Sequence, residues 1–453
     1  MSLEGLTQLS PDGRALPRLA DRWVWENDGL RLRAVLHPNV LFHSGQPLDS
    51  STAAEALQAA VSRPANRALY PSLNYVTAVK PGGELQVTLD LSQRSAFLPE
   101  DLEIPLQLGN EVGTGAFRIV ENTPAQITLQ GFDKYHEGPP SIAKVTIKPF
   151  ATLRTAWTSL LRGDVDMASD VPPEAVEFIS NDQVQVIPFV RRYQYLIAFN
   201  STRKPFSSPV VRRALNVAVD RNELIRNVLQ GRGTPATGPL WPNYWAYDKT
   251  VQSFNFDPTL ASSLLDAAGL RMVAEKSQPG RRARLRFTCL IPADFSILER
   301  IALDVQKQLY NVGVDVQFQV VPVQETDARI RSGQFDAVLL DMISGPTPGR
   351  AYIFWRSASK FRGLNFFGYD NPAAERLFDI VRTSTNNDGA VRSATRGLQS
   401  VFFQDPPALF LVWNERARAL RRDFQVPQEP GRDPLLSLWR WKPISTTQAQ
   451  STQ

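Results

Sequence analysis

Side chains that could do covalent or metal chemistry are sparse in this chain. The histidines are His37, His43 and His136, and the one cysteine is Cys289. His37 and His43 have no third metal ligand near them in the sequence, so we interpret them as hydrogen-bonding residues of a strand and a turn. A single cysteine excludes an internal disulfide framework, and neither HExxH nor GxSxG occurs. The sequence therefore predicts no catalytic residues, no bound metal and no cofactor.

Two short motifs look like ligand sites but have simpler interpretations. Gly113-Thr114-Gly115 has no third glycine at GxGxxG spacing and continues as a strand, so we interpret it as a tight turn that enters a strand rather than as a phosphate cradle. Asp164 and Asp166 lie in a segment without the glycine and the terminal glutamate of a calcium loop. We expect a turn there.

Charge and length limit the class of protein. The 453 residues carry 50 Lys and Arg against 45 Asp and Glu, which gives a net charge of +5. The arginines are scattered, and around Arg284 and Arg286 they alternate with apolar residues as on the solvent face of a strand. We expect no nucleic-acid partner, because no recognised motif accompanies the charge. The length exceeds that of one core, so two or three domains are expected.

The stretch 193–231 predicts a strand followed by two helices. Tyr195–Phe199 is an apolar run of strand length, and Ser208 with the following proline suits the start of a helix. The helical repeat of apolar residues there leaves Arg212 and Arg213 on the solvent-facing side.

The second helix of this stretch carries signals at both ends. Asp220 suits its N-cap, and Glu223 stands three residues on, as in a capping box. Gly231 suits its C-terminal end.

Three further elements are predicted from local signals. Asp49 and Asp257 suit the N-caps of two other helices, and residues 435–441 are expected to form a final strand.

A strand-helix-glycine-strand pattern occurs twice in the chain. Residues 144–168 contain Gly163 after the helix, and residues 314–340 contain Gly333 in the same place. The two copies lie about 170 residues apart, which is too far for a solenoid repeat. The pattern predicts two α/β lobes, each with one βαβ-like unit.

Several segments of the chain resemble one family. Phe199-Asn200, Pro205-Phe206, Val211–Leu215 and Ala218–Arg221 are similar to the signature of the family 5 extracellular solute-binding proteins, the receptor subunits of peptide and nickel ABC importers. The resemblance implies an α/β fold with mixed sheets of the type II periplasmic-binding-protein kind. Such a fold has two lobes, with an extra small sheet subdomain on the first.

Domain boundaries follow from this resemblance. We expect a core of lobe I from residues 1–17, 105–194 and 430–453. Residues 18–104 are expected to form the accessory sheet subdomain, and residues 195–429 form lobe II.

The resemblance also implies a function. Two lobes would close on a small solute, peptide-like or other, and the closed form of a monomer would deliver it to an ABC permease in the membrane. The location would be periplasmic or extracytoplasmic. The N-terminus lacks the basic and apolar regions of a signal peptide, so we expect that the given sequence starts after one. A cytoplasmic ligand-sensing module of a regulator is the alternative.

Five candidate ligand-binding residues lie where the chain is expected to cross between the lobes. They are Tyr193, Tyr195, Asn200, Trp413 and Asn414. Ligands of two-lobed proteins bind between the lobes, against aromatic surface and a few polar groups. The alternative for each tyrosine is that its side chain packs in a core.

The segment 341–355 is expected to be a loop that sets ligand choice. Peptide-binding members of the family carry an acid there that pairs with the peptide's amino terminus, whereas Ser344–Pro348 contains none. An unpaired buried ammonium is costly, so free-amine peptides are disfavoured. Arg350 would bind a carboxylate or phosphate, or face solvent. Tyr352 and Trp355 would stack on a ligand, or pack the lobe.

Overall fold

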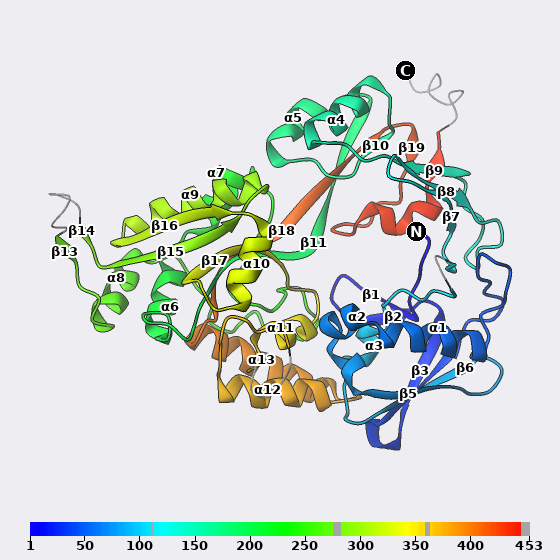
Figure 1. Cartoon of the computed structure of the whole chain (residues 1–453), viewed down its shortest axis with the longest axis horizontal. Helices are drawn as coiled ribbons and strands as arrows, with labels where there is room; N and C mark the ends of the chain where they lie inside the picture. The colour runs from blue at the N-terminus through cyan, green and yellow to red at the C-terminus, as the bar shows by residue number, and fades with distance from the viewer. Residues whose placement is uncertain (110–111, 275–281, 358–362, 445–453) are drawn as a thin grey trace. The chain divides into compact units, whose positions relative to one another are not determined.

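The computed structural model describes residues 1–109, 112–274, 282–357 and 363–444 (Figure 1). The chain divides into two compact units. Unit 1 contains Met1–Arg191 and Glu415–Gln453, and unit 2 contains Arg192–Asn414. The finer division of the first lobe into a core and an accessory subdomain stays a prediction.

Both boundaries between the units fall inside long strands. Strand β11 (Val184–Phe199) carries the chain into unit 2, and strand β18 (Ala408–Arg421) carries it back. In unit 2 the sheet order is β18-β11-β17-β15-β16, and in unit 1 the short strand β10 (Met167–Ala168) pairs with β18.

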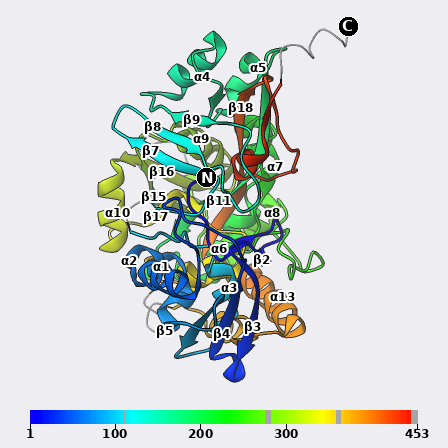
Figure 2. The same ribbon diagram turned by 90° about the vertical axis from the view of Figure 1, so that its right-hand side faces the viewer.

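The larger antiparallel sheets of unit 1 have four and three strands. The four-stranded sheet has the order β3-β4-β6-β5, and helix α1 (Ser50–Ser62) contacts β5 and β6 (Figure 2). Asp49 caps α1 as predicted, because its carboxylate accepts from the first-turn N–H groups. The strands of the two sheets are β3 (Ala20–Glu26), β4 (Arg31–Leu36), β5 (Val76–Pro81) and β6 (Gln86–Leu91), then β7 (Phe117–Asn122), β8 (Ile127–Gly131) and β9 (Lys144–Ile147).

Short elements complete unit 1. The strand predicted at 435–441 is wrong, because Pro434–Arg440 forms a 3-10 helix whose N-cap Asp433 accepts from the Leu435 N–H at 3.1 Å. The remaining elements are β1 (Thr7–Leu9), β2 (Ala15–Pro17), α2 (Pro64–Leu69), α3 (Leu98–Asp101), α4 (Leu153–Arg162), α5 (Val176–Ile179), β19 (Phe424–Gln425) and β20 (Lys442–Pro443).

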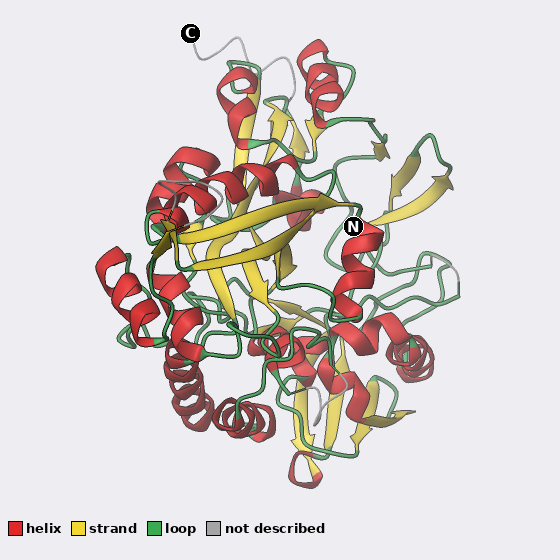
Figure 3. Ribbon diagram, turned by 60° about the vertical axis from the view of Figure 1, so that its left-hand side comes forward, coloured by secondary structure: helices red, strands yellow, loops and turns green. Residues whose placement is uncertain are grey.

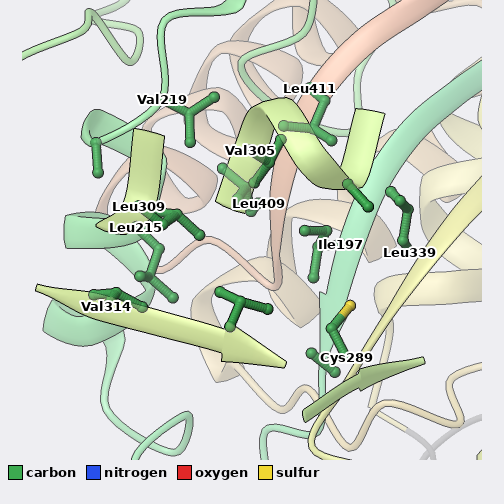
Figure 4. Close-up of a cluster of buried hydrophobic side chains, with 14 of the residues drawn as sticks. Ile197, Leu215, Val219, Cys289, Val305, Leu309, Val314, Leu339, Leu409 and Leu411 are labelled. Carbon is green, nitrogen blue, oxygen red and sulfur yellow. The ribbon is translucent and has the colours of Figure 1, made fainter. Parts of the chain in front are cut away.

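Unit 2 is a mixed sheet covered by helices. Strand β15 (Leu285–Pro292) runs parallel to β16 (Val314–Val321) and to β17 (Ala337–Ile343), and Figure 3 shows these strands among helices. Apolar residues of the sheet and of helices that include α6 (Pro209–Val217), α7 (Arg221–Leu229) and α9 (Ser296–Tyr310) form its largest core (Figure 4). The other elements are β12 (Thr234–Pro235), α8 (Pro258–Ala267), β13 (Val273–Ala274), β14 (Arg282–Ala283), α10 (Val323–Arg331), α11 (Pro348–Trp355), α12 (Pro372–Thr383) and α13 (Asp388–Gln404).

The predicted repeat of a βαβ unit is half wrong. The second copy, β16-α10-β17, belongs to one sheet with β15 between its strands. The first copy does not, because β9 pairs with β8 while β10 pairs antiparallel with β18. Gly163 and Gly333 both have the positive φ that their helix ends were predicted to need, at 80° and 67°. The local pattern was interpreted correctly, but it does not specify the partner strands.

Side-chain partners distant in sequence decide the details of α6 and α7. Arg212 is buried rather than solvent-facing, since it donates to the Pro406 carbonyl at 2.7 Å and pairs with Asp405. Asp220 caps α7 as predicted. Its own N–H donates to Oε1 of Gln308 at 2.6 Å, so α9 supplies a partner that the capping-box pattern assigned to α7 itself.

The glycines at 113 and 115 serve close approach rather than a tight turn. The Gly115 N–H donates to the Ser2 carbonyl at 3.1 Å, and a Cβ at this position would lie 2.3 Å from the Met1 carbonyl oxygen. At Gly113 a Cβ would lie 2.1 Å from the Ser2 carbonyl oxygen. Both positions therefore need glycine because the N-terminal segment runs directly beside them.

Candidate ligand-binding site

Three strands of unit 2 meet at one edge of its sheet, where β17 ends and where β11 and β18 cross the boundary with unit 1. Strand β11 enters the unit at Arg192, and Tyr193 is paired with Ile343, the last residue of β17. Strand β18, on the other side of β11, leaves the unit after Asn414. We call this region the strand-end site. It contains three of the residues that the sequence predicted to bind ligand, Tyr193, Trp413 and Asn414.

An acid that the sequence analysis overlooked lies in this site. Nδ2 of Asn414 donates to Oδ1 of Asp341 at 3.2 Å, and this bond passes over β11, where Tyr195 is the partner of Asp341. The Asp341 side chain is partly exposed. Asp341 is the first residue of the segment 341–355, three residues before Ser344. A charged residue inside the otherwise apolar strand β17 was the signal that could have revealed it.

Trp413 is buried but keeps one unmet polar group. Its ring packs edge-on against Trp241, with centroids 4.9 Å apart and planes at 74°. Gly345 lies against the same ring, because a Cβ there would be 3.1 Å from it. Among the described residues, no acceptor lies within hydrogen-bonding distance of its Nε1.

Gln194, next to Tyr193 on β11, also has a buried polar atom without a hydrogen-bond partner among the described residues. Its side chain is fully buried, and its Nε2 donates to the Gly238 carbonyl at 2.8 Å. In the part of the chain that the structure describes, its Oε1 has no donor. Gln194 and Trp413 thus contact the same segment, Gly238–Trp241. Nothing in the sequence pattern distinguished Gln194 from any other strand residue.

Two predicted ligand-binding residues, Tyr195 and Asn200, have structural partners within unit 2, and their contact with a ligand stays a prediction. Tyr195 belongs to the large core of unit 2. Asn200 donates from Nδ2 to the carbonyls of Gly333 and Phe335, at 3.2 and 3.1 Å, and its Oδ1 accepts from the Thr202 hydroxyl at 2.6 Å. These bonds hold the turn after β11, which explains the residue without a ligand.

The segment 341–355 is not one loop. It begins inside β17 and ends as α11, so the loop prediction is wrong for its two ends. Tyr352 packs on Phe378 at 5.7 Å and Trp355 on Phe367 at 5.4 Å, and both side chains are buried. They pack the lobe rather than offer stacking surface. Arg350 on α11 is also buried, which excludes the solvent-facing alternative.

The buried side chain of Arg221 donates to backbone carbonyls next to the strand-end site. Nε of Arg221 donates to the carbonyls of Ala236 and Phe410, at 2.6 and 2.8 Å, and Nη1 donates to the Asn216 carbonyl at 2.9 Å. Burial lowers the pKa of the Arg221 guanidinium to about 9, which still leaves it protonated at neutral pH. Because Ala236 precedes the Gly238–Trp241 segment and Phe410 precedes Trp413, this one side chain ties both parts of the site together.

Two side chains that were considered for chemistry, His43 and Cys289, have surroundings that suit a structural role. Nε2 of His43 lies 2.8 Å from the Gly115 carbonyl, and Cys289 is buried, which raises the pKa of its thiol. No group of three or more His, Cys, Asp or Glu side chains is arranged to hold a metal ion within the described ranges. Of the helices in those ranges, none is long and apolar enough to cross a membrane.

Comparison with known proteins identifies the family. The profile of the bacterial extracellular solute-binding proteins, family 5 (middle region), matches residues 14–362. This chain belongs to that family. It is 26% identical over 441 residues to the glutathione-binding protein GsiB of Pectobacterium atrosepticum, an alignment that covers 90% of this chain and 82% of the relative.

Solved structures show the same fold. NikZ from Campylobacter jejuni, in complex with Ni(L-His), superposes with a TM-score of 0.81 at 19% identity, over 98% of this chain and 94% of that one. The oligopeptide-binding protein AppA from Bacillus subtilis, in complex with a nonapeptide, gives 0.77 at 21% identity, over 98% and 93%. The predicted mixed α/β fold of the class II periplasmic binding proteins is confirmed.

Family membership also establishes the general function. The protein is a substrate-binding protein of an ABC transporter, and its family consists of solute-binding proteins rather than enzymes. The family is an extracellular or periplasmic one.

Proposed function

We propose that this receptor binds a short peptide or peptide-like solute through the strand-end site of unit 2. The observation that carries the proposal is the pairing of Asp341 with Asn414, beside the partly exposed Tyr193. The named ligands of two relatives, glutathione and a nonapeptide, are peptides, which supports this ligand class.

Asp341 supplies the acid whose absence from Ser344–Pro348 disfavoured free-amine peptides. A carboxylate can accept several hydrogen bonds at its two oxygens, and the Asn414 amide donates to one of these oxygens, Oδ1. A ligand ammonium at Asp341 would therefore be paired rather than left as a lone charge. Arg350 remains our candidate for the ligand's carboxylate.

Transport would follow from movement of the two units about β11 and β18, the strands that connect them. The solute stabilises the closed form only to the extent that it binds that form more tightly. We propose that the closed monomer then docks on an ABC permease in the membrane, with no nucleic acid involved.

The test combines ligand identification with calorimetry. Small molecules released from the purified protein are identified by mass spectrometry, and the recovered peptide is titrated with a free and with an acetylated amino terminus. We expect Asp341→Asn to weaken binding of the free-amine form by about 10- to 100-fold, the worth of a charge-assisted hydrogen bond.

Asp327 provides the matched control. It pairs with Arg331 on an exposed face of α10, so Asp327→Asn removes the same charge from unit 2 without touching the strand ends. Its affinity is expected to equal that of the wild type. Recovery of a ligand without amide or amine groups, or equal binding by Asp341→Asn, would contradict the proposal.

A further inference from the structure

Two fully buried polar atoms of the strand-end site have no hydrogen-bond partner among the described residues. They are Oε1 of Gln194 and Nε1 of Trp413, on side chains with relative exposures of 0% and 1%. An unmet buried donor or acceptor costs about 1–3 kcal/mol, so native proteins hold few of them.

Both side chains are otherwise firmly held. Gln194 is oriented by its bond from Nε2 to the Gly238 carbonyl, and Trp413 by the rings and backbone of Trp241 and Gly345. A simple rotation of the glutamine amide would bring its Oε1 against the Gly238 carbonyl oxygen. The unmet atoms are therefore consequences of this packing.

One other buried tryptophan and one other buried glutamine, both outside the strand-end site, do have partners. Trp441 of unit 1 is 3% exposed, and its Nε1 donates to the Pro434 carbonyl at 3.3 Å. Gln308 of unit 2 is 5% exposed, its Oε1 accepts from the Asp220 N–H at 2.6 Å and its Nε2 donates to Asp304 at 2.6 Å. Where the same residue types serve only the fold, their polar atoms are paired.

The two unmet atoms are chemically complementary. Gln194 offers an acceptor and Trp413 a donor, and both side chains pack on Gly238–Trp241. A secondary amide carries one N–H and one C=O on the same planar unit, so it fits this combination, whereas an ester lacks the donor.

We propose that Gln194 and Trp413 form an amide-recognition pair of the receptor. Oε1 of Gln194 accepts from the ligand's amide N–H, and Nε1 of Trp413 donates to its carbonyl. This assignment rests on the proposed function, because it assumes a peptide-like ligand. It adds the residues that read the amide bond itself, separate from Asp341, which meets the ammonium.

Access to the pair requires a local shift. Both atoms are covered by protein, and the segment that contacts both side chains is Gly238–Trp241. An amide therefore meets them when this segment moves aside. The ligand then supplies two hydrogen bonds that the empty protein lacks.

The first test uses the indole N–H of Trp413 as a reporter. Full-length protein with ¹⁵N-labelled tryptophan is titrated with N-methylacetamide, the smallest secondary amide of the trans type, and separately with methyl acetate. The Trp413 resonance, assigned from its loss in Trp413→Phe, is expected to shift saturably with the amide. The ester carbonyl can still accept from Nε1 but offers no N–H to Gln194, so the same shift should need about a fivefold to tenfold higher concentration of the ester. The Trp441 resonance, whose N–H already has an acceptor, is expected to shift with neither.

The second test uses affinity for a peptide identified from the purified protein. Trp413→Phe and Gln194→Met keep the shape of each side chain, and each is expected to weaken binding about fivefold to tenfold, the worth of one hydrogen bond in a buried site. The matched controls Trp441→Phe and Gln308→Met are expected to leave affinity unchanged.

The two proposals fail separately. Peptide binding that is unchanged in Trp413→Phe and Gln194→Met, with a silent Trp413 resonance, would overturn the amide pair and leave the proposed function intact. A saturable shift with N-methylacetamide, abolished in Gln194→Met, would support the pair even if Asp341→Asn had no effect on peptide affinity.

Discussion

The cluster around Glu4 in unit 1 and the strand-end site in unit 2 treat buried polar atoms in opposite ways. The buried Glu4 carboxylate accepts from Thr114 at 2.9 Å, Tyr135 at 2.9 Å and His136 at 3.2 Å, and it pairs with Arg18 at 2.5 Å. We call these five residues the Glu4 cluster. In the strand-end site, by contrast, Gln194 and Trp413 each keep an unmet atom.

We interpret the Glu4 cluster as a feature that stabilises the fold, whereas we propose that the strand-end site binds ligand. The Glu4 cluster joins the N-terminal segment to three later parts of unit 1, and its charges are matched within the protein. A ligand would have nothing to add there. In the strand-end site two atoms lack partners among the described residues, and we propose that a ligand supplies them. Variants in the two regions should therefore affect different quantities.

The largest expected effect is on stability, in the Glu4 cluster. Glu4→Gln removes the buried partner of Arg18, which keeps the more exposed Glu137 at 2.8 Å, so the loss should lie near the lower end of the about 3–5 kcal/mol that breaking a buried pair costs. Chemical denaturation followed by circular dichroism measures the loss. Ligand affinity of the folded fraction should not change. A Glu4→Gln variant as stable as the wild type would contradict the stabilising role given to the Glu4 cluster.

A smaller loss is expected at Arg221, which supports the strand-end site but does not belong to it. Arg221→Lys cannot reach both the Ala236 and the Phe410 carbonyls, and the unmet acceptors should cost about 2–3 kcal/mol. Hydrogen exchange should rise around residues 236–241 and 408–414. Unchanged exchange there would contradict the role given to Arg221.

The pH dependence of stability should change when Glu4 is replaced. Burial by itself would raise the pKa of Glu4, but the hydrogen bond from His136 and the charge of Arg18 outweigh it and lower that pKa. A carboxylate with a depressed pKa contributes stability above its unfolded value, about 4.3, and that stability is lost as the pH falls through the lower folded pKa. Denaturation between pH 3 and pH 7 should therefore depend less on pH in Glu4→Gln than in the wild type.

The smallest expected effect is a difference in stability between two tryptophan variants. Trp441→Phe leaves the Pro434 carbonyl without its donor and should cost about 1 kcal/mol beyond the change in ring size. Trp413→Phe removes a donor that has no partner in the described structure, so its loss should be smaller by that amount. Paired melting curves measure the difference. Equal losses would mean that the Trp413 N–H is satisfied in the empty protein.

Local signals in the sequence predicted the elements well. Asp49, Asp220 and Asp257 cap helices as expected, because a cap depends on residues within one turn. The predictions that failed depend on distant partners. Arg212 was assigned to a solvent face because its partner, Asp405, lies 193 residues away, and the first βαβ unit failed because β10 pairs with β18.

The same contrast between local signals and distant partners applies to the candidate site. Family resemblance placed the crossover strands correctly, so the predicted residues Tyr193, Trp413 and Asn414 lie in the site that we propose. Asp341 and Gln194 were missed, since their significance comes from Asn414 on another strand and from Gly238 in another loop. Tyr352 and Trp355 were included for their chemistry, but neighbours such as Phe378 and Phe367 use their rings for packing.

The most direct test of the contrast between the two regions is one pair of calorimetric titrations. The peptide recovered from the purified protein is titrated into Glu4→Gln and Asp341→Asn under conditions where both are folded. We predict wild-type affinity for Glu4→Gln, despite its lower stability, and an affinity about 10- to 100-fold weaker for Asp341→Asn. Equal affinities in the two variants would contradict the assignment of ligand binding to the strand ends of unit 2.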